Sequence, residues 1–245
     1  MSFLVVAAGV LLAFTIEAMT GFGSIVLALS IGALVMDIPV LVQWLVPLNI
    51  MMTAPLVWRY RHAVQGKLLL TQILPFMGIG TLAGVWLTEH LHAVYTQGIF
   101  ALLICWFAAR ALFNVSAPAH SQPVRNTLIT GAGITHGLFA SGGPLLVYAL
   151  ARAELDKTRL RATLLCIWLV LNSALTLWFF FYGELTHYLK EVGMLLPCVL
   201  AGAITGNYLH HKVSQQTFTR LVFAVLLMTG IVLALKTLNQ LLTSG

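Results

Sequence analysis

The sequence predicts an all-α protein that crosses a membrane several times and consists of two inverted structural repeats. Three observations lead to this prediction: the composition, the spacing of the apolar stretches, and the distribution of lysine and arginine. Of the 245 residues, 60% are hydrophobic and 8% are charged, and the mean hydropathy is +0.95. Soluble domains carry about 25% charged residues. The surface of this chain is therefore suited to lipid.

Eight long apolar stretches follow one another with little between them. Most are close to the ~20 residues with which a helix crosses a hydrocarbon core of ~30 Å. No polar stretch between them exceeds about a dozen residues, so no extramembrane domain is expected. The first stretch lacks the basic region of a cleavable signal peptide, and it is expected to be retained. The stretches cover residues 2–36, 38–58, 68–88, 94–113, 126–151, 162–182, 192–209 and 217–235.

The chain repeats itself with an offset of about 122 residues. A proline and two glycines open two of the stretches with identical spacing, as Pro75, Gly80 and Gly84 and again as Pro197, Gly202 and Gly206. Thr20-Gly21-Phe22-Gly23 matches Ala140-Ser141-Gly142-Gly143 at an offset of 120, and Asn49 matches Asn172 at 123. Internal repeats are a common build for transporters. We expect a first membrane repeat over residues 1–114, a linker over 115–125 and a second membrane repeat over 126–245. Each repeat is a glycine-broken element followed by three transmembrane helices.

The basic residues favour an inverted arrangement. If all eight stretches crossed the membrane, lysine and arginine would be divided between its two faces, against the positive-inside rule. If the first and fifth stretches are re-entrant hairpins, eleven basic residues share one face and only Lys190 and Lys236 lie opposite. We therefore expect six crossing helices and two hairpins, with both termini outside; eight full crossings are the alternative. The eleven residues are Arg59, Arg61, Lys67, Arg110, Arg125, Arg152, Lys157, Arg159, Arg161, Lys212 and Arg220.

The glycine-rich breaks predict an anion site between the repeats. Non-helical backbone inside a membrane is tolerated only where protein or a water-filled cavity satisfies its polar groups. A second helical arm follows each break, near Ser24 and near Pro144, and the N–H groups that begin a helix attract anions. The alternative is that the glycines only let helices pack closely. The substrate-binding candidates in the breaks are Thr20, Gly21, Gly23, Ser24, Ser141, Gly142 and Gly143.

Other polar residues inside the apolar stretches complete the candidate site. Asn49 and Asn172 lie on the helix after each break and are substrate-binding candidates, with helix–helix contact as the alternative. Glu17, one turn before the first break, is a proton-coupling candidate, or else it caps the broken backbone. His136 takes nearly the same place in the second repeat and is the other proton-coupling candidate, with packing as its alternative. Arg161 belongs to a cluster that fixes topology, and its alternative role is to draw anions toward the cavity.

No metal or cofactor is expected. Cys105, Cys166 and Cys198 each stand alone in an apolar stretch, without the spacing of disulfides or metal ligands. The nucleotide-binding pattern GxxxxGK[ST] is absent, so a proton or ion gradient would drive transport, or transport is passive. The expected partners are a small anionic substrate, coupled protons and the lipid bilayer, with no nucleic acid and with a homodimer left open.

Several segments resemble the TauE/SafE sulfite exporter family. Ile134-Thr135-His136-Gly137-Leu138-Phe139-Ala140-Ser141-Gly142-Gly143-Pro144-Leu145-Leu146 is similar to its second signature, and Asp156-Lys157, Arg161-Ala162-Thr163, Trp168 and Asn172 continue the likeness. Glu17-Ala18-Met19-Thr20-Gly21-Phe22-Gly23 looks like the matching segment of the first half. The resemblance implies a carrier in the cell inner membrane of a prokaryote, for sulfite, sulfonates or related small anions. The first-half segment departs from the longer glycine run of many relatives, so the half-sites are expected to contribute unequally.

These observations together predict a secondary transporter, and not an enzyme. We expect it to export a small anion, sulfite or an organosulfonate, by alternating access around the two breaks. An anion channel is one alternative, and it would show neither saturation nor coupling. An intramembrane serine protease is another, in which Ser141 would be the nucleophile and His136 the nearby base.

Overall fold

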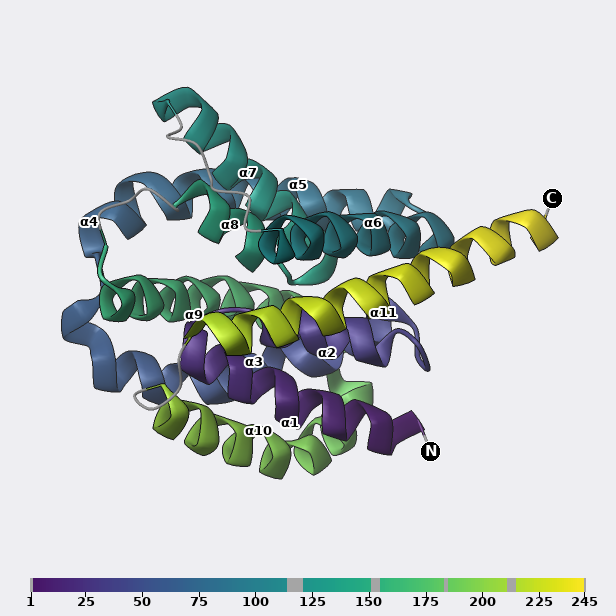
Figure 1. Cartoon of the computed structure of the whole chain (residues 1–245), viewed down its shortest axis with the longest axis horizontal. Coiled ribbons are helices and arrows are strands. Elements are labelled where there is room, and N and C mark those ends of the chain that lie inside the picture. Colours follow the sequence, from purple (N-terminus) through teal and green to yellow (C-terminus); the bar gives the residue numbers. More distant parts are fainter. Residues whose placement is uncertain (1, 114–120, 151–154, 183–184, 211–214, 245) are drawn as a thin grey trace.

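A computed structural model describes residues 2–113, 121–150, 155–182, 185–210 and 215–244 of the chain (Figure 1). Over these residues it consists of helices and short connections, without a strand, which confirms the predicted all-α class. The helices of the first half are α1 (Ser2–Thr20), α2 (Ser24–Gly32), α3 (Ile38–Tyr60), η1 (Arg61–Ala63), α4 (Gly66–Leu68), η2 (Leu69–Ile73), α5 (Leu74–His90) and α6 (Ala93–Leu112). Those of the second half are α7 (Gln122–Phe139), α8 (Gly143–Ala149), α9 (Lys157–Phe181), η3 (Leu185–Tyr188), α10 (Leu189–Leu209) and α11 (Gln215–Ser244).

Several helices have the length and composition of membrane spans. Among the described residues, five are long and apolar enough to cross: Ser2–Thr20, Ile38–Ala63, Gly66–His90, Thr158–Phe181 and Leu189–Leu209. Two shorter apolar helices, Val94–Arg110 and Leu226–Leu242, accompany them. The chain is therefore a multi-pass membrane protein. The first helix alone is long enough to span, whereas the sequence prediction made it one arm of a hairpin, so the number of crossings remains a prediction.

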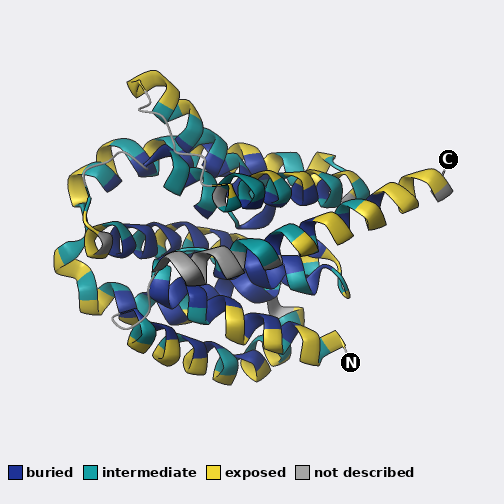
Figure 2. Cartoon of the chain, in the orientation of Figure 1, coloured by how far each residue is buried: buried dark blue, intermediate teal, exposed yellow. Residues whose placement is uncertain are grey.

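The outer surface is rich in large apolar side chains. Phe181, Ile204 and Leu4 expose 79%, 73% and 72% of their area. Figure 2 shows such exposed positions along the outward sides of the helices, with the buried residues gathered between them. Water would solvate this surface poorly, because apolar area left in water costs about 25 cal/mol per Å². Lipid is the environment to which it is suited.

The helices of the two halves pack in corresponding pairs. Helix α1 packs along α10, and α7 packs along α5. Helices α3 and α9 contact each other, as do α6 and α11, and each broken element folds back on itself through α1–α2 or α7–α8. Figure 1 places both chain termini at one end of the molecule and α4 at the opposite end.

Glycines allow two of these helix pairs to approach closely. A Cβ added at Gly84 of α5 would lie 2.3 Å from the Ile134 carbonyl oxygen of α7, and one added at Gly206 of α10 would lie 2.1 Å from the Thr15 oxygen of α1. Small residues give membrane helices such contacts in place of a hydrophobic driving force. The two contacts correspond, since Gly84 and Gly206 are 122 positions apart and Thr15 and Ile134 are 119 apart.

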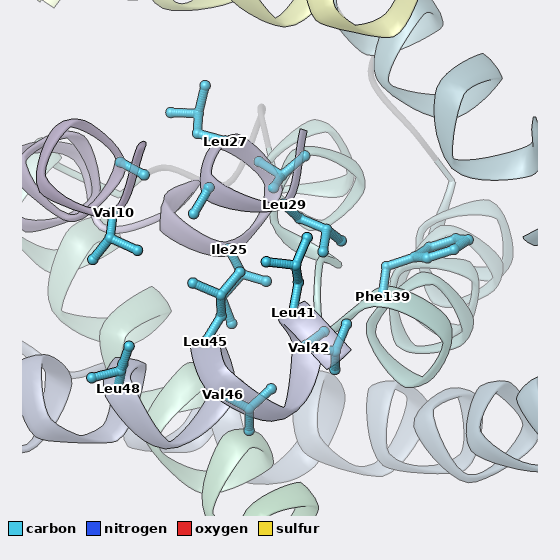
Figure 3. Packing of buried hydrophobic residues seen from close by; sticks show 14 of the residues in the cluster. Val10, Ile25, Leu27, Leu29, Leu41, Val42, Leu45, Val46, Leu48 and Phe139 are labelled. Atoms are coloured by element: carbon cyan, nitrogen blue, oxygen red, sulfur yellow. The ribbon is translucent and has the colours of Figure 1, made fainter. Parts of the chain in front are cut away.

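Helix α2 is buried in the middle of the molecule. Eight of its nine residues are buried, and it contacts α1 and α3. Figure 3 shows Ile25 and Leu29 of α2 among Leu41 and Leu45 of α3. The short α2 therefore has no lipid-facing side, and its N-terminus lies inside the protein, where the first break begins.

Candidate functional site

A cavity lies where the two broken elements meet. It is small, with a volume of about 20 Å³, and both halves of the chain contribute to its wall. The elements that line it are the end of α1, the start of α2, the α7–α8 connection, and the middle of α3 and α9. The lining residues are Glu17, Gly23, Ile25, Val26, Asn49, Ala140, Ser141, Gly143, Pro144, Trp168 and Asn172.

The first break requires its glycines. Helix α1 ends at Thr20, and Gly21 and Gly23 adopt φ of 92° and 106°, a region that other residues rarely occupy. Gly21 also packs against α9, because a Cβ there would lie 2.9 Å from the Cα of Arg161. Gly23, with nothing within 4 Å of its Cβ position, instead borders the cavity. The two glycines therefore have different roles: Gly21 allows contact with α9, and Gly23 forms part of the cavity wall.

The side chain of Glu17, which belongs to α1, reaches the N-terminus of α2. Its side chain is 2% exposed; Oε2 accepts a hydrogen bond from the Ser24 backbone N–H at 2.8 Å, and Oε1 accepts one from Asn49 Nδ2 at 2.8 Å. The same Asn49 Nδ2 lies 3.0 Å from Ser24 Oγ. A carboxylate is stabilised at this place by the unpaired N–H groups of the helix start. Glu17 thus caps α2, one of its two expected roles, and this helix start is not free for a second anion.

The second break presents a free hydroxyl. Helix α7 ends at Phe139, Ala140 adopts φ of 50°, and α8 begins at Gly143 after Gly142. Ser141 lies between them with its Oγ buried and without a hydrogen-bond partner. No acidic side chain of the second half lines the cavity, whereas Glu17 lines it beside the first break.

Two asparagines join the halves beside the cavity. Asn172 Nδ2 donates to Asn49 Oδ1 at 2.7 Å, and each side chain is 1% exposed. The Nδ2 group of Asn49 donates to Glu17 and is not turned toward Asn172. The Oδ1 atom of Asn172 is therefore left buried and without a partner. A buried unpaired polar group costs about 1–3 kcal/mol. The free oxygen of Asn172 and the free hydroxyl of Ser141 therefore provide hydrogen-bonding capacity that a molecule in the cavity would use.

The other candidates do not line the cavity. The Thr20 hydroxyl bonds to the carbonyl oxygens of Ile16 and Phe22, at 2.8 and 2.9 Å, and Ser24 is bound as described above. Gly142 faces α7, since a Cβ there would lie 2.3 Å from the Ala132 oxygen. Gly21 contacts α9. The candidates that do line the cavity are Glu17, Gly23, Asn49, Ser141, Gly143 and Asn172.

His136 is stacked in the protein interior. Its ring lies on that of Trp168, with centroids 5.7 Å apart and planes at 26°, and the side chain is fully buried. Neither ring nitrogen has a hydrogen-bond partner, and neither does Ser141 Oγ. The hydrogen bond between nucleophile and base that a serine protease needs is therefore not formed between these residues.

Trp168 also lines the cavity, although the sequence pointed to it only through the family resemblance and not as a site candidate. Its Nε1 donates to the Gly21 carbonyl at 2.9 Å, and its ring carries His136, so it ties the first break to α7. Trp168 is four positions before Asn172 on α9, and residues at this spacing share one face of a helix. That spacing from a candidate asparagine is the signal that could have found it.

The chain is similar to known membrane transporters. The family model described as sulfite exporter TauE/SafE matches residues 5–233. The chain is similar to a "Probable inner membrane transporter protein TsaS" from Comamonas testosteroni, at 26% identity over 163 residues, which are 65% of this chain and 68% of that protein. No solved structure matches. The resemblance noted in the sequence is confirmed: the chain belongs to the sulfite exporter TauE/SafE family of membrane transporters.

Proposed function

We propose that this protein is a secondary transporter that exports a small anion, sulfite or an organosulfonate, across the inner membrane. The observation that supports this most strongly is the cavity between the two breaks, in which Ser141 and Asn172 hold unpaired polar atoms. The family supplies the substrate class, and the name of the Comamonas relative supplies the inner membrane.

We infer that the substrate binds asymmetrically, against the second break. Glu17 already fills the start of α2, so the free hydroxyl of Ser141 and the backbone around Gly143 are the remaining donors. Asn172 Oδ1 is an acceptor and favours a ligand that also carries a proton, such as a hydrogen-bearing oxyanion.

Proton coupling follows from the position of Glu17 in the wall of the same cavity. Two negative charges in a small cavity of low dielectric constant repel each other strongly. An anion therefore binds best when the Glu17 carboxyl is protonated, and protonation is in turn favoured when the anion is bound. Such mutual preference couples the two in the same direction. An anion generated inside the cell leaves with a proton when its own gradient exceeds the opposing proton gradient.

The corresponding helix pairs support alternating access. The pair α1–α10 corresponds to the pair α7–α5, each made of one helix from each half, with close glycine contacts at equivalent positions. Two such units, inverted with respect to each other, can rock around the central cavity and open it to each side in turn.

Anion flux into proteoliposomes tests the proposal. The panel is sulfite, thiosulfate, sulfoacetate, taurine, sulfate and acetate, each with and without a pH gradient. We expect saturable flux of a sulfur-containing anion, faster with a pH gradient directed along the flux. Ser141→Ala should weaken it about tenfold, the effect of losing one hydrogen bond to an anion.

The alternatives give different results in the same assay. Flux that rises linearly with concentration and ignores the pH gradient indicates a channel. Movement of cations without any anion, or no flux from a folded protein, overturns the proposal.

A further inference from the structure

A buried guanidinium lies next to the first break. Arg161, in the second turn of α9, is 2% exposed, and its Cα is the atom that a Cβ at Gly21 would meet. Arg161, Trp168 and Asn172 are seven and four positions apart, a spacing that puts them on one face of α9. The guanidinium-bearing residue is therefore about 10 Å along the helix from Trp168 in the cavity wall, toward the end where α4 lies.

Arg161 holds together the end of α1 and the end of α10. Its Nη2 donates to the Ala18 carbonyl and, at 3.1 Å, to Asn207 Oδ1. The guanidinium carbon also lies 4.9 Å from the centre of the Tyr60 ring. Nearby, His210 Nδ1 lies 2.7 Å from the Met19 carbonyl oxygen. These contacts join α1, α3, α9 and α10 at one level of the molecule.

The charge of Arg161 is not balanced. It forms no ion pair among the described residues, and Nε and Nη1 have no hydrogen-bond partner although both are buried. A buried charge without a counterion is costly, and a guanidinium has the fork of donors that matches an oxyanion. The residue therefore has both the need for an anion and the free donors to hold one.

The other end of the molecule is open at the corresponding place. A cavity of about 150 Å³ lies there, and its wall includes Ile38, Val85, Thr88 and Gly137. Each of these positions has a counterpart in the repeat. Ile38 matches Arg161 at an offset of 123 residues, Val85 and Thr88 match Asn207 and His210 at 122, and Ala18 matches Gly137 at 119. The contacts of Arg161 thus occupy the position that is hollow at the other end of the molecule.

We propose that Arg161 is a second oxyanion site, at the mouth of the central cavity on the basic side, and that its bonds to Ala18 and Asn207 hold this mouth closed when no anion is there. The inference rests on the proposed function, because the anion it takes is the transported one. An arriving oxyanion takes the free Nε and Nη1 donors and draws Arg161 away from Ala18 and Asn207. The mouth then opens, and the anion passes along the α9 face to Ser141.

Side-specific transport kinetics test the binding part. Radiolabelled sulfite flux is measured from each side of oriented vesicles holding wild type, Arg161→Gln or Arg161→Lys. For Arg161→Gln we expect KM from the basic side to rise about tenfold or more, as for a lost charge-assisted hydrogen bond. The KM from the opposite side should change much less, and Arg161→Lys should recover part of the loss.

The matched control is Arg159→Gln. Arg159 lies two residues before Arg161, and its side chain is exposed and paired with Asp156, so the substitution removes the same charge from outside the proposed site. It should leave both KM values unchanged. An equal rise in KM from both sides for Arg161→Gln, or no rise from either side, would overturn the proposal. If Arg161→Gln does not fold, Arg161→Lys is used instead, and its KM from the basic side is compared with its KM from the opposite side in the same way.

A cysteine reporter tests the closed mouth without any substrate. Val26, in the cavity wall, is replaced by cysteine in a background where Cys105, Cys166 and Cys198 are alanine. We expect Asn207→Ala to speed labelling from the basic side by an impermeant thiol reagent about tenfold, since one closing bond is lost. An unchanged rate contradicts the gate. If wild type carries no anion at all, the proposed function fails, while this labelling still decides whether the mouth is held closed.

Discussion

Both carboxylate oxygens of Glu17 are bound inside the protein, one by the start of α2 and one by Asn49. The same residue therefore stabilises the first break and places a titratable group in the cavity wall. These two duties depend on different properties, because hydrogen bonding to Ser24 N needs an acceptor and coupling needs a titratable proton. A substitution that keeps the acceptor and removes the charge separates them.

Glu17→Gln is that substitution. Its amide oxygen can still accept from Ser24 N, and the Asn49 and Asn172 amides can turn to accommodate its NH₂ group. We expect anion flux to persist but to lose its dependence on a pH gradient, measured in proteoliposomes with and without that gradient. Asp37→Asn, which removes an exposed carboxylate at the start of α3, is the control and should keep the dependence. A pH dependence that survives Glu17→Gln would assign coupling elsewhere.

Trp168 gives a second prediction for a single residue. Trp168→Phe keeps an aromatic ring against His136 but leaves the Gly21 carbonyl without its donor. We expect a loss of about 1–3 kcal/mol in stability, the cost of an unsatisfied buried acceptor, seen as a lower Tm in detergent. Trp106→Phe, at a side chain that is 46% exposed, should leave Tm nearly unchanged. Equal Tm values for the two variants would mean that the bond to Gly21 contributes nothing.

At the scale of elements, the repeated glycines show what spacing can and cannot predict. The recurrence of Gly80 and Gly84 as Gly202 and Gly206 indicated corresponding helices, and those helices are α5 and α10. Spacing does not state which neighbour a helix meets, because that depends on contacts between distant segments. The pairing of α5 with α7 and of α10 with α1 is a tertiary fact. In the same way, the match of Asn49 with Asn172 did not reveal that the two amides bond each other.

Enlarging these glycines should separate the helix pairs. A Cβ at Gly206 would lie 2.1 Å from the Thr15 oxygen, which is backbone and cannot give way. We expect Gly206→Ala to cost about 1–3 kcal/mol, the usual cost of overpacking, and Gly84→Ala to behave alike. Gly193→Ala on α10 and Gly78→Ala on α5, where nothing lies within 4 Å, are the matched controls. Melting in detergent checks this, and a Gly206→Ala variant as stable as Gly193→Ala would show that the pair is looser than the contact implies.

At the scale of the whole molecule, composition was sufficient to predict an all-α membrane protein. With so few charged residues, the chain could not cover its surface with groups that water solvates. A cavity beside the two breaks was also predictable, since broken helices inside a membrane need a polar cavity. The role of each individual residue at the cavity was not predictable. Whether Thr20 faces a ligand or its own backbone depends on a rotamer, and whether Arg161 fixes topology or binds depends on how deeply α9 is packed.

The orientation of the two halves is the prediction on which the transport cycle depends. Re-entrant first and fifth elements put Arg61 and Arg159 on the same side, together with most of the basic residues, and put both termini opposite. Figure 1 has both termini at one end and α4, which closely follows Arg61, at the other. We expect reporters fused after Arg61 and after Arg159 to be active on the cytoplasmic side, and a reporter at the C-terminus to be outside. Eight full crossings would put the first two on opposite sides. Parallel repeats of that kind would no longer match α1–α10 with α7–α5 by inversion, and the rocking that opens the cavity to each side in turn would lose its structural basis.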